Sequence, residues 1–180
     1  MKIRPGILSI CILVSCNLFS QDTTAWKINV IDSIVSVIVP GNLKMSTPAE
    51  RFTVGSLNYE QIIFGILKID ALETVPLPKD TMELRDSYDK VLKGFMKSMP
   101  GGILIGQEEI KQGKYIGRYT KIKMNKRGVD YYIECKTFFL NEDNYGMQVI
   151  YPISFEKESE SLRKKYLNSL IIAASVKQFN

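Results

Sequence analysis

The sequence predicts an α+β domain in which two main helices pack on a curved antiparallel sheet of about six to seven strands. Segments rich in isoleucine, valine and tyrosine favour strands, and they fall at residues 26–39, 51–70 and 103–151. Apolar residues with a helical period predict helices at residues 80–99 and 154–172. Two helices cover such a sheet only if it curls, so this order of elements predicts an α/β sandwich.

The first strands are predicted on both sides of Asp32 and Ser33, within residues 26–39. Residues 40–42 (Pro-Gly-Asn) are typical of a turn, and the polar residues 46–50 interrupt the strand pattern. Residues 51–70 then predict a hairpin. Its second strand is apolar at both odd and even positions, which indicates a central strand covered on both faces.

The clearest helix is predicted at residues 80–99. Asp80 is a suitable N-cap, and Glu83 stands in the capping-box position. The apolar stripe follows at spacings of one, three and four, through Leu84, Tyr88, Val91, Leu92, Phe95 and Met99. The sequence Pro-Gly-Gly at residues 100–102 ends the helix. The stripe is expected to face the sheet.

Four more strands are predicted between the two helices, at residues 103–110, 114–124, 129–140 and 145–151. Short turns separate them, which predicts an antiparallel meander. In the third strand the odd-numbered residues form an apolar face, and the even-numbered residues, such as Glu134, face a wetter side. Cys135 is on the apolar face and is expected to be buried and inert.

The closing helix at residues 154–172 carries its own apolar stripe. The stripe residues are Leu162, Tyr166, Leu167, Leu170 and Ile171. The solvated side is expected to hold Arg163, Lys164 and Lys165. No internal repeat or low-complexity linker interrupts residues 21–180, which are therefore expected to form a single domain.

Residues 1–20 are interpreted as a secretory signal peptide. Lys2 and Arg4 precede an apolar run at residues 7–15, and Ser20 is a small residue at the expected cleavage point. The run is much shorter than the ~20 residues that span a bilayer. The protein is therefore expected to be exported, in the periplasm or as a secreted protein.

A second cleavage site is compatible with the same segment. Residues 13–16 (Leu-Val-Ser-Cys) are similar to a bacterial lipobox, and cleavage before Cys16 would leave a lipidated cysteine and an outer-membrane lipoprotein. Cleavage after Ser20 is favoured, because Leu18 and Phe19 make a poor polar tether. Attachment to a membrane is expected only if Cys16 is lipidated.

Composition excludes several classes of chemistry. The chain has no histidine, which excludes Ser-His-Asp and Cys-His catalysis and histidine ligation of zinc or haem. Cys135 alone remains beyond Cys16, too few for an intramolecular disulfide or a four-cysteine metal site. Loss of Lys2 and Arg4 lowers the formal charge from +5 to +3, without the basic stripe of a nucleic-acid binder. We expect no cofactor, no metal and no nucleic acid.

Three further patterns have an ordinary interpretation beside a functional one. Residues 141–144 (Asn-Glu-Asp-Asn) offer oxygen ligands to calcium, but four polar residues between strands favour a hairpin turn. Glu108 and Glu109 point to opposite faces of a strand and do not form a carboxylate pair. The tyrosines of the meander are expected to close the core with their hydroxyls in water, and a ligand-stacking cleft is the alternative.

The element order resembles that of the PsbP-like superfamily. The resemblance rests on the Val-Pro-Gly-Asn turn at residues 39–42, the helix before a long meander, and the final Leu-Asn-Ser-Leu-Ile-Ile at residues 167–172. That group includes extrinsic proteins of the photosynthetic oxygen-evolving complex and DcrB-type bacterial periplasmic proteins. The resemblance implies a binding or assembly module and carries over no catalytic residue.

The sequence is therefore compatible with two functions. The first is an exported, non-catalytic binding or accessory module for an unknown protein or small molecule. The alternative is a histidine-free hydrolase that acts on an extracytoplasmic substrate through carboxylates. It requires two carboxylates about 5–10 Å apart across a cleft. Glu60, Asp130 and Glu134 are the candidates.

Overall fold

The computed structural model describes residues 25–70 and 77–179. Its strands are β1 (Lys27–Val30), β2 (Val35–Val39), β3 (Lys44–Ala49), β4 (Phe52–Tyr59), β5 (Ile62–Ile69), β6 (Ile103–Gln112), β7 (Tyr115–Lys126), β8 (Val129–Leu140), β9 (Asp143–Pro152) and β10 (Ile171–Ile172). Its helices are α1 (Thr81–Ser98), the short 3₁₀ helix η2 (Ile153–Phe155) and α2 (Glu160–Leu167). The predicted signal peptide and Cys16 lie outside the described residues.

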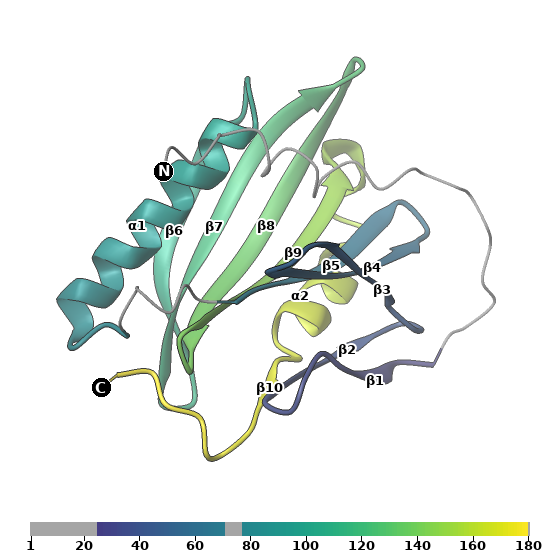
Figure 1. Ribbon diagram of the computed structural model, residues 1–180. Coiled ribbons are helices and arrows are strands. Elements are labelled where there is room, and N and C mark those ends of the chain that lie inside the picture. The colour runs from purple at the N-terminus through teal and green to yellow at the C-terminus, as the bar shows by residue number, and fades with distance from the viewer. Residues whose placement is uncertain (1–24, 71–76, 180) are drawn as a thin grey trace.

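The large sheet has seven antiparallel strands in the order β3-β4-β5-β9-β8-β7-β6, and a small sheet has the order β1-β2-β10. Helix α1 lies on one side of the large sheet, while α2 and the small sheet lie on the other (Figure 1). The predicted α+β class, with its antiparallel sheet and two main helices, is confirmed. The meander is also confirmed, because β6, β7, β8 and β9 pair in chain order.

The last predicted helix is wrong in its extent. After η2 the chain turns, α2 covers only Glu160–Leu167, and the chain then extends as β10 beside β2. The Ser169 hydroxyl accepts a hydrogen bond from the Ile38 amide at 3.0 Å and donates one to the Ile38 carbonyl at 3.1 Å. Pairing with the edge of β2 therefore replaces the last helical turns, which the helical spacing of Leu167, Leu170 and Ile171 could not reveal.

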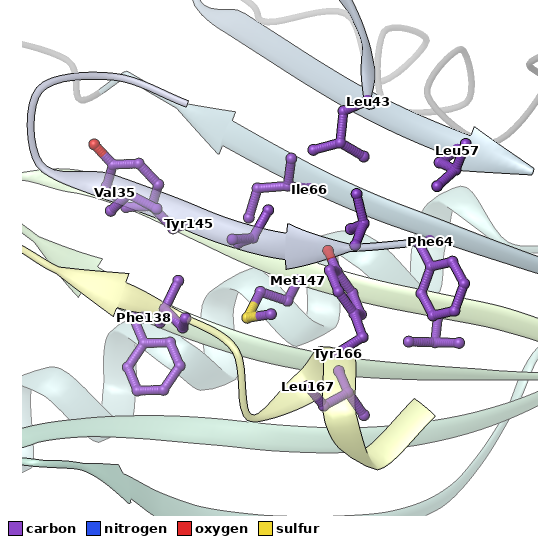
Figure 2. Packing of buried hydrophobic residues seen from close by; sticks show 14 of the residues in the cluster. Val35, Leu43, Leu57, Phe64, Ile66, Phe138, Tyr145, Met147, Tyr166 and Leu167 are labelled. Atoms are coloured by element: carbon purple, nitrogen blue, oxygen red, sulfur yellow. The ribbon is translucent and has the colours of Figure 1, made fainter. Parts of the chain in front are cut away.

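The main hydrophobic core fills the space between the large sheet and the layer formed by α2 and the small sheet. Figure 2 shows Tyr166 and Leu167 of α2 beside Phe64 and Met147 of the large sheet. The rings of Phe64 and Tyr166 meet edge to face, with 5.1 Å between their centroids. The prediction that β5 is a central strand is confirmed, since it pairs with β4 and β9.

Residues 46–50 were expected to break the strand pattern, and this expectation is wrong. Most of them belong to β3, the edge strand of the large sheet, whose residues are nearly all exposed. An exposed edge strand does not need alternating apolar residues, and its free edge tolerates Pro48. The sequence therefore carried no burial signal for β3.

The turn between β8 and β9 is tighter than predicted. Leu140 pairs with Asp143, so only Asn141 and Glu142 form the loop, both with positive φ (47° and 76°). Two such residues match the twist of an antiparallel hairpin. Asn144, assigned to the turn from the sequence, therefore lies inside β9, in the row of the sheet that contains Phe139.

Candidate functional site

The sheet face beneath α1 carries small and polar side chains at its centre. The registers of β7, β8, β9 and β5 form two adjacent rows, Thr120–Cys135–Gln148–Gly65 and Arg118–Thr137–Gly146–Leu67. A Cβ atom added to Gly146 would meet only the Cys135 sulfur, at 3.7 Å. Glycine at this position therefore leaves space above the sheet that a larger side chain would occupy.

Helix α1 begins as the sequence predicts. The Asp80 carboxylate accepts hydrogen bonds from the amides of Met82 and Glu83 at 2.8 and 2.9 Å. The Glu83 carboxylate accepts one from the Lys79 amide at 2.9 Å, one residue before the amide that a capping box uses. These bonds fix where α1 starts and hence which of its faces meets the sheet.

The first half of α1 is held firmly against the sheet. Leu84 and Tyr88 are buried, and the Tyr88 hydroxyl donates to the Ile116 carbonyl at 2.9 Å and accepts from the Phe139 amide at 3.2 Å. Burial raises the pKa of this hydroxyl well above its usual value, so it remains a donor at neutral pH. Beyond Tyr88 the stripe residues Leu92 and Phe95 are half-buried, and Met99 at the end of the stripe is buried against Ile122 and Ile133.

A cavity of about 60 Å³ lies between the second half of α1 and the sheet. Its apolar lining comes from Leu67, Ile69, Val91, Leu92 and Phe95. Its polar lining comes from Arg118, Thr120, Thr137, Asn144 and Gln148. The volume exceeds the ~10–15 Å³ that one water molecule needs. The cavity therefore has room for part of a small molecule, with an apolar wall on the helix side and polar groups on the sheet.

Two nitrogen atoms in this lining lack hydrogen-bond partners among the described residues. They are Nε of Arg118 and Nδ2 of Asn144, and both atoms are buried. Asn144 as a whole is only 7% exposed. An unpaired buried donor costs about 1–3 kcal/mol, so both nitrogens are available to a hydrogen-bond acceptor in the cavity. Sequence reasoning missed Arg118 and considered Asn144 only as part of a turn or a calcium ligand.

Cys135 also lines the cavity, and its predicted burial is confirmed. The residue is 6% exposed, and its sulfur lies 3.5 Å from the Thr137 hydroxyl. Burial raises the pKa of the thiol to about 11, so the reactive thiolate is scarce at neutral pH.

Native Cys135 is therefore expected to react with a maleimide at least about tenfold more slowly than the same residue in urea. Cys135→Ala should lower the free energy of unfolding by about 1 kcal/mol. Met82→Cys, placed in the Cys135→Ala protein at a site that is 69% exposed in the first turn of α1, is the matched control and should react at least as fast as unfolded Cys135. Equal rates for native and unfolded Cys135 would contradict the burial.

On the opposite face of the sheet, two expectations about solvent exposure are wrong. Glu134 and Arg163 were expected to face water, but they are 5% and 6% exposed and form an ion pair. Arg163 precedes Tyr166 by three residues and Leu167 by four, so it shares their buried face of α2. The layer formed by α2 and the small sheet covers the face of β8 that was expected to be wet.

The expectation that the tyrosine hydroxyls reach water is wrong for three tyrosines of the meander. Tyr151 donates to Glu134 at 2.5 Å, and Tyr145 donates to Asp32 at 2.6 Å. Tyr115 donates to the Val176 carbonyl at 3.2 Å. These tyrosines close the core, as expected, but their hydroxyls end on protein acceptors because the small sheet and the C-terminal segment cover them.

An open groove of about 820 Å³ lies beside α2 on this face. Its lining contains five glutamates and five lysine or arginine residues, so it has no net charge. Lys121 pairs with Glu156 and Lys164 with Glu160, each at 2.5 Å, and Arg163 pairs with Glu134. Because these charges largely satisfy one another, the groove offers less to a ligand than the cavity beneath α1 does.

The three carboxylates proposed for a hydrolase do not converge. Asp130 pairs with Lys123 at 2.8 Å, and it lies four residues from Glu134 along β8, about 13 Å away. Glu60 lies in the turn between β4 and β5, and β9 separates β5 from β8.

Other acidic residues were considered as a carboxylate pair or as metal ligands. Glu109 pairs with Arg85 of α1 at 2.8 Å, whereas Glu108 lines the groove, so their predicted divergence is confirmed. Within residues 25–70 and 77–179, no group of three or more histidine, cysteine, aspartate or glutamate side chains is arranged to hold a metal ion.

Solved structures with the same arrangement of elements are found at low sequence identity. Cyanobacterial PsbP from Synechocystis sp. PCC 6803 is 10% identical with a TM-score of 0.62, and the match covers 89% of this chain and 99% of that one. The chain has the PsbP-like fold. The resemblance suggested by the element order is thereby confirmed at the level of fold.

Two further structures share this PsbP-like fold. The protein of unknown function PA94 from Pseudomonas aeruginosa is 12% identical, with a TM-score of 0.56 over 83% of this chain and 99% of that one. LpqN, involved in cell envelope biogenesis of Mycobacterium tuberculosis, is 12% identical, with a TM-score of 0.51 over 83% and 91%. No family model and no curated protein matches the sequence.

In the part of the chain that the structure describes, neither α1 nor α2 is long and apolar enough to cross a membrane.

Proposed function

We propose that this protein is an exported, non-catalytic binding module that holds a small, largely apolar molecule in the cavity beneath α1. The proposal rests on the incomplete packing between α1 and the sheet at that cavity. Leu92 and Phe95 on the helix face a sheet surface with Gly146 at its centre. A domain that needed only stability would fill such a space, because interiors are normally close-packed.

The arrangement of α1 supports access to the cavity. Capping by Asp80 and the Tyr88 hydrogen bonds hold the first half of the helix. The part of the helix over the cavity, around Leu92 and Phe95, is half-buried between Tyr88 and the buried Met99, so a local displacement of that part admits a ligand. Export is proposed from the signal-like residues 1–20, with cleavage after Ser20 giving a soluble periplasmic or secreted protein.

The test uses 1-octanol as a neutral apolar probe. Its addition to the ¹⁵N-labelled protein should shift the amide resonances of Cys135 and Gly146 in a saturable way. Gly146→Leu should fill the cavity and weaken binding at least about tenfold, the effect of losing roughly 1.4 kcal/mol. Gly106→Leu is the matched control, because a Cβ at Gly106 meets no atom within 4 Å and the residue lies outside the cavity lining.

A folded Gly146→Leu protein that binds octanol as tightly as the wild type would overturn the proposal. If Gly146→Leu does not fold, Leu92→Trp fills the same cavity from the helix side and should give the same loss of binding. Octanol-induced shifts confined to residues outside the cavity lining would also contradict the assignment.

A further inference from the structure

We infer that the molecule held beneath α1 ends in a carboxylate, and that Arg118 and Asn144 recognise it. This inference rests on the proposed function, since it names the class of ligand for the same cavity. Both residues lie on the sheet side, and each has a buried nitrogen without a partner among the described residues.

The chemistry of these two atoms sets the polarity of the ligand. Nε of a guanidinium and Nδ2 of a carboxamide only donate hydrogen bonds. A ligand that satisfies both must therefore present acceptors. A carboxylate has two oxygens with several lone pairs, so it can accept from two donors at once, which an alcohol does less well.

The charge near Arg118 favours an anion over a neutral acceptor. The contact of Arg118 with Asp89 is 3.4 Å long, and Asp89 is itself about half exposed. Charge-assisted contacts are usually about 2.7–2.9 Å long, so Asp89 neutralises the guanidinium incompletely. Glu109, opposite Arg118 on β6, is already engaged by Arg85 at 2.8 Å.

The remainder of the lining requires an apolar body. Leu67, Ile69, Val91, Leu92 and Phe95 surround the space above the two donors. The ligand class is therefore a short apolar carboxylate, with its acid group on the sheet and its chain under α1. Asn144 lies on the face of β9 beneath α1, where an apolar residue would normally pack against the helix. A ligand carboxylate bound beside it accounts for an asparagine at this position.

The experiment compares three probes with the same chain, octanoate, 1-octanol and octylammonium, by calorimetric titration of the whole protein. Octanoate should bind at least about tenfold more tightly than octanol, the expected effect of one charge-assisted hydrogen bond. Octylammonium should bind more weakly than octanol, because it brings donors and a positive charge to Arg118.

Variants then test the two residues. Asn144→Leu and Arg118→Met should each reduce the preference for octanoate over octanol by about tenfold while octanol binding persists. Asn144→Asp, which is nearly isosteric, should abolish the preference for octanoate over octanol, because the new carboxylate offsets the charge of Arg118 and repels that of the ligand. Lys136→Met removes a positive charge from the opposite face of the sheet, in the groove beside α2, and is the matched control that should retain the preference.

The outcomes separate the two proposals. Octanol binding as tightly as octanoate, or an octanoate preference that survives both variants, would overturn the carboxylate inference and leave the cavity as an apolar site. Failure of all three probes to bind would overturn the proposed function together with this inference.

Discussion

Arg163→Met is expected to lower the free energy of unfolding by about 3–5 kcal/mol, the typical effect of breaking a buried ion pair. The variant leaves the Glu134 carboxylate in a site that is 5% exposed. It also removes the hydrogen bonds that Arg163 donates to the Ser159 hydroxyl at 2.9 Å and the Glu156 carbonyl at 2.8 Å. Urea unfolding followed by circular dichroism measures the loss.

A second variant separates the buried charge from the loss of packing. Adding Glu134→Gln to Arg163→Met removes the buried charge, whose remaining ion-pair partner is Lys121 at 3.8 Å, and retains an acceptor for the Tyr151 hydroxyl, so most of the stability should return. Lys164→Met breaks only an exposed pair with Glu160 on the same helix and should change stability by less than about 0.5 kcal/mol. A double variant as unstable as Arg163→Met alone would contradict this explanation.

Leu84→Asp is expected to have an effect of similar size, about 3–5 kcal/mol, because it removes a buried leucine and desolvates a carboxylate. Leu84 is 0% exposed and lies in the first half of α1, which docks the helix on the sheet. The same measurement of urea unfolding applies. Loss of the docked helix should also expose Cys135 to maleimide.

The control for this variant is two residues earlier on the same helix. Met82 is 69% exposed in the first turn of α1, where a negative charge is favoured by the helix dipole. Met82→Asp should therefore be neutral or slightly stabilising. Equal losses at Leu84 and Met82 would show that the helix faces the sheet differently from the arrangement described.

Local patterns predicted most of the large sheet and helix α1. The Asp80 cap and the stripe through Leu84 and Tyr88 located α1, since both depend only on residues close together in the sequence. The end of the last helix was not predictable in this way. It depends on Ser169 and β10 meeting β2, which is more than 130 residues earlier in the chain.

The candidate site was missed for a related reason. Asn144 was assigned to a turn because residues 141–144 are all polar, whereas Asn141 and Glu142 alone form the turn, Glu142 with a φ of 76° that is uncommon for a glutamate. One signal was present in the sequence. Asn144 and Gln148 are polar residues in the largely apolar β9, with Gly146 between them, whereas Arg118 lies among other polar residues of β7 and gave no such signal. Their convergence required the registers of three strands.

The most direct test of a binding site beneath α1 is the nuclear Overhauser effect between unlabelled octanoate and the ¹³C,¹⁵N-labelled protein. Octanoate bound beneath α1 should give cross-peaks from its chain to Leu92, Phe95 and Ile69, which line the cavity. Cross-peaks confined to exposed apolar residues of β1, such as Ile28 and Val30, would place the ligand outside the cavity and contradict the account.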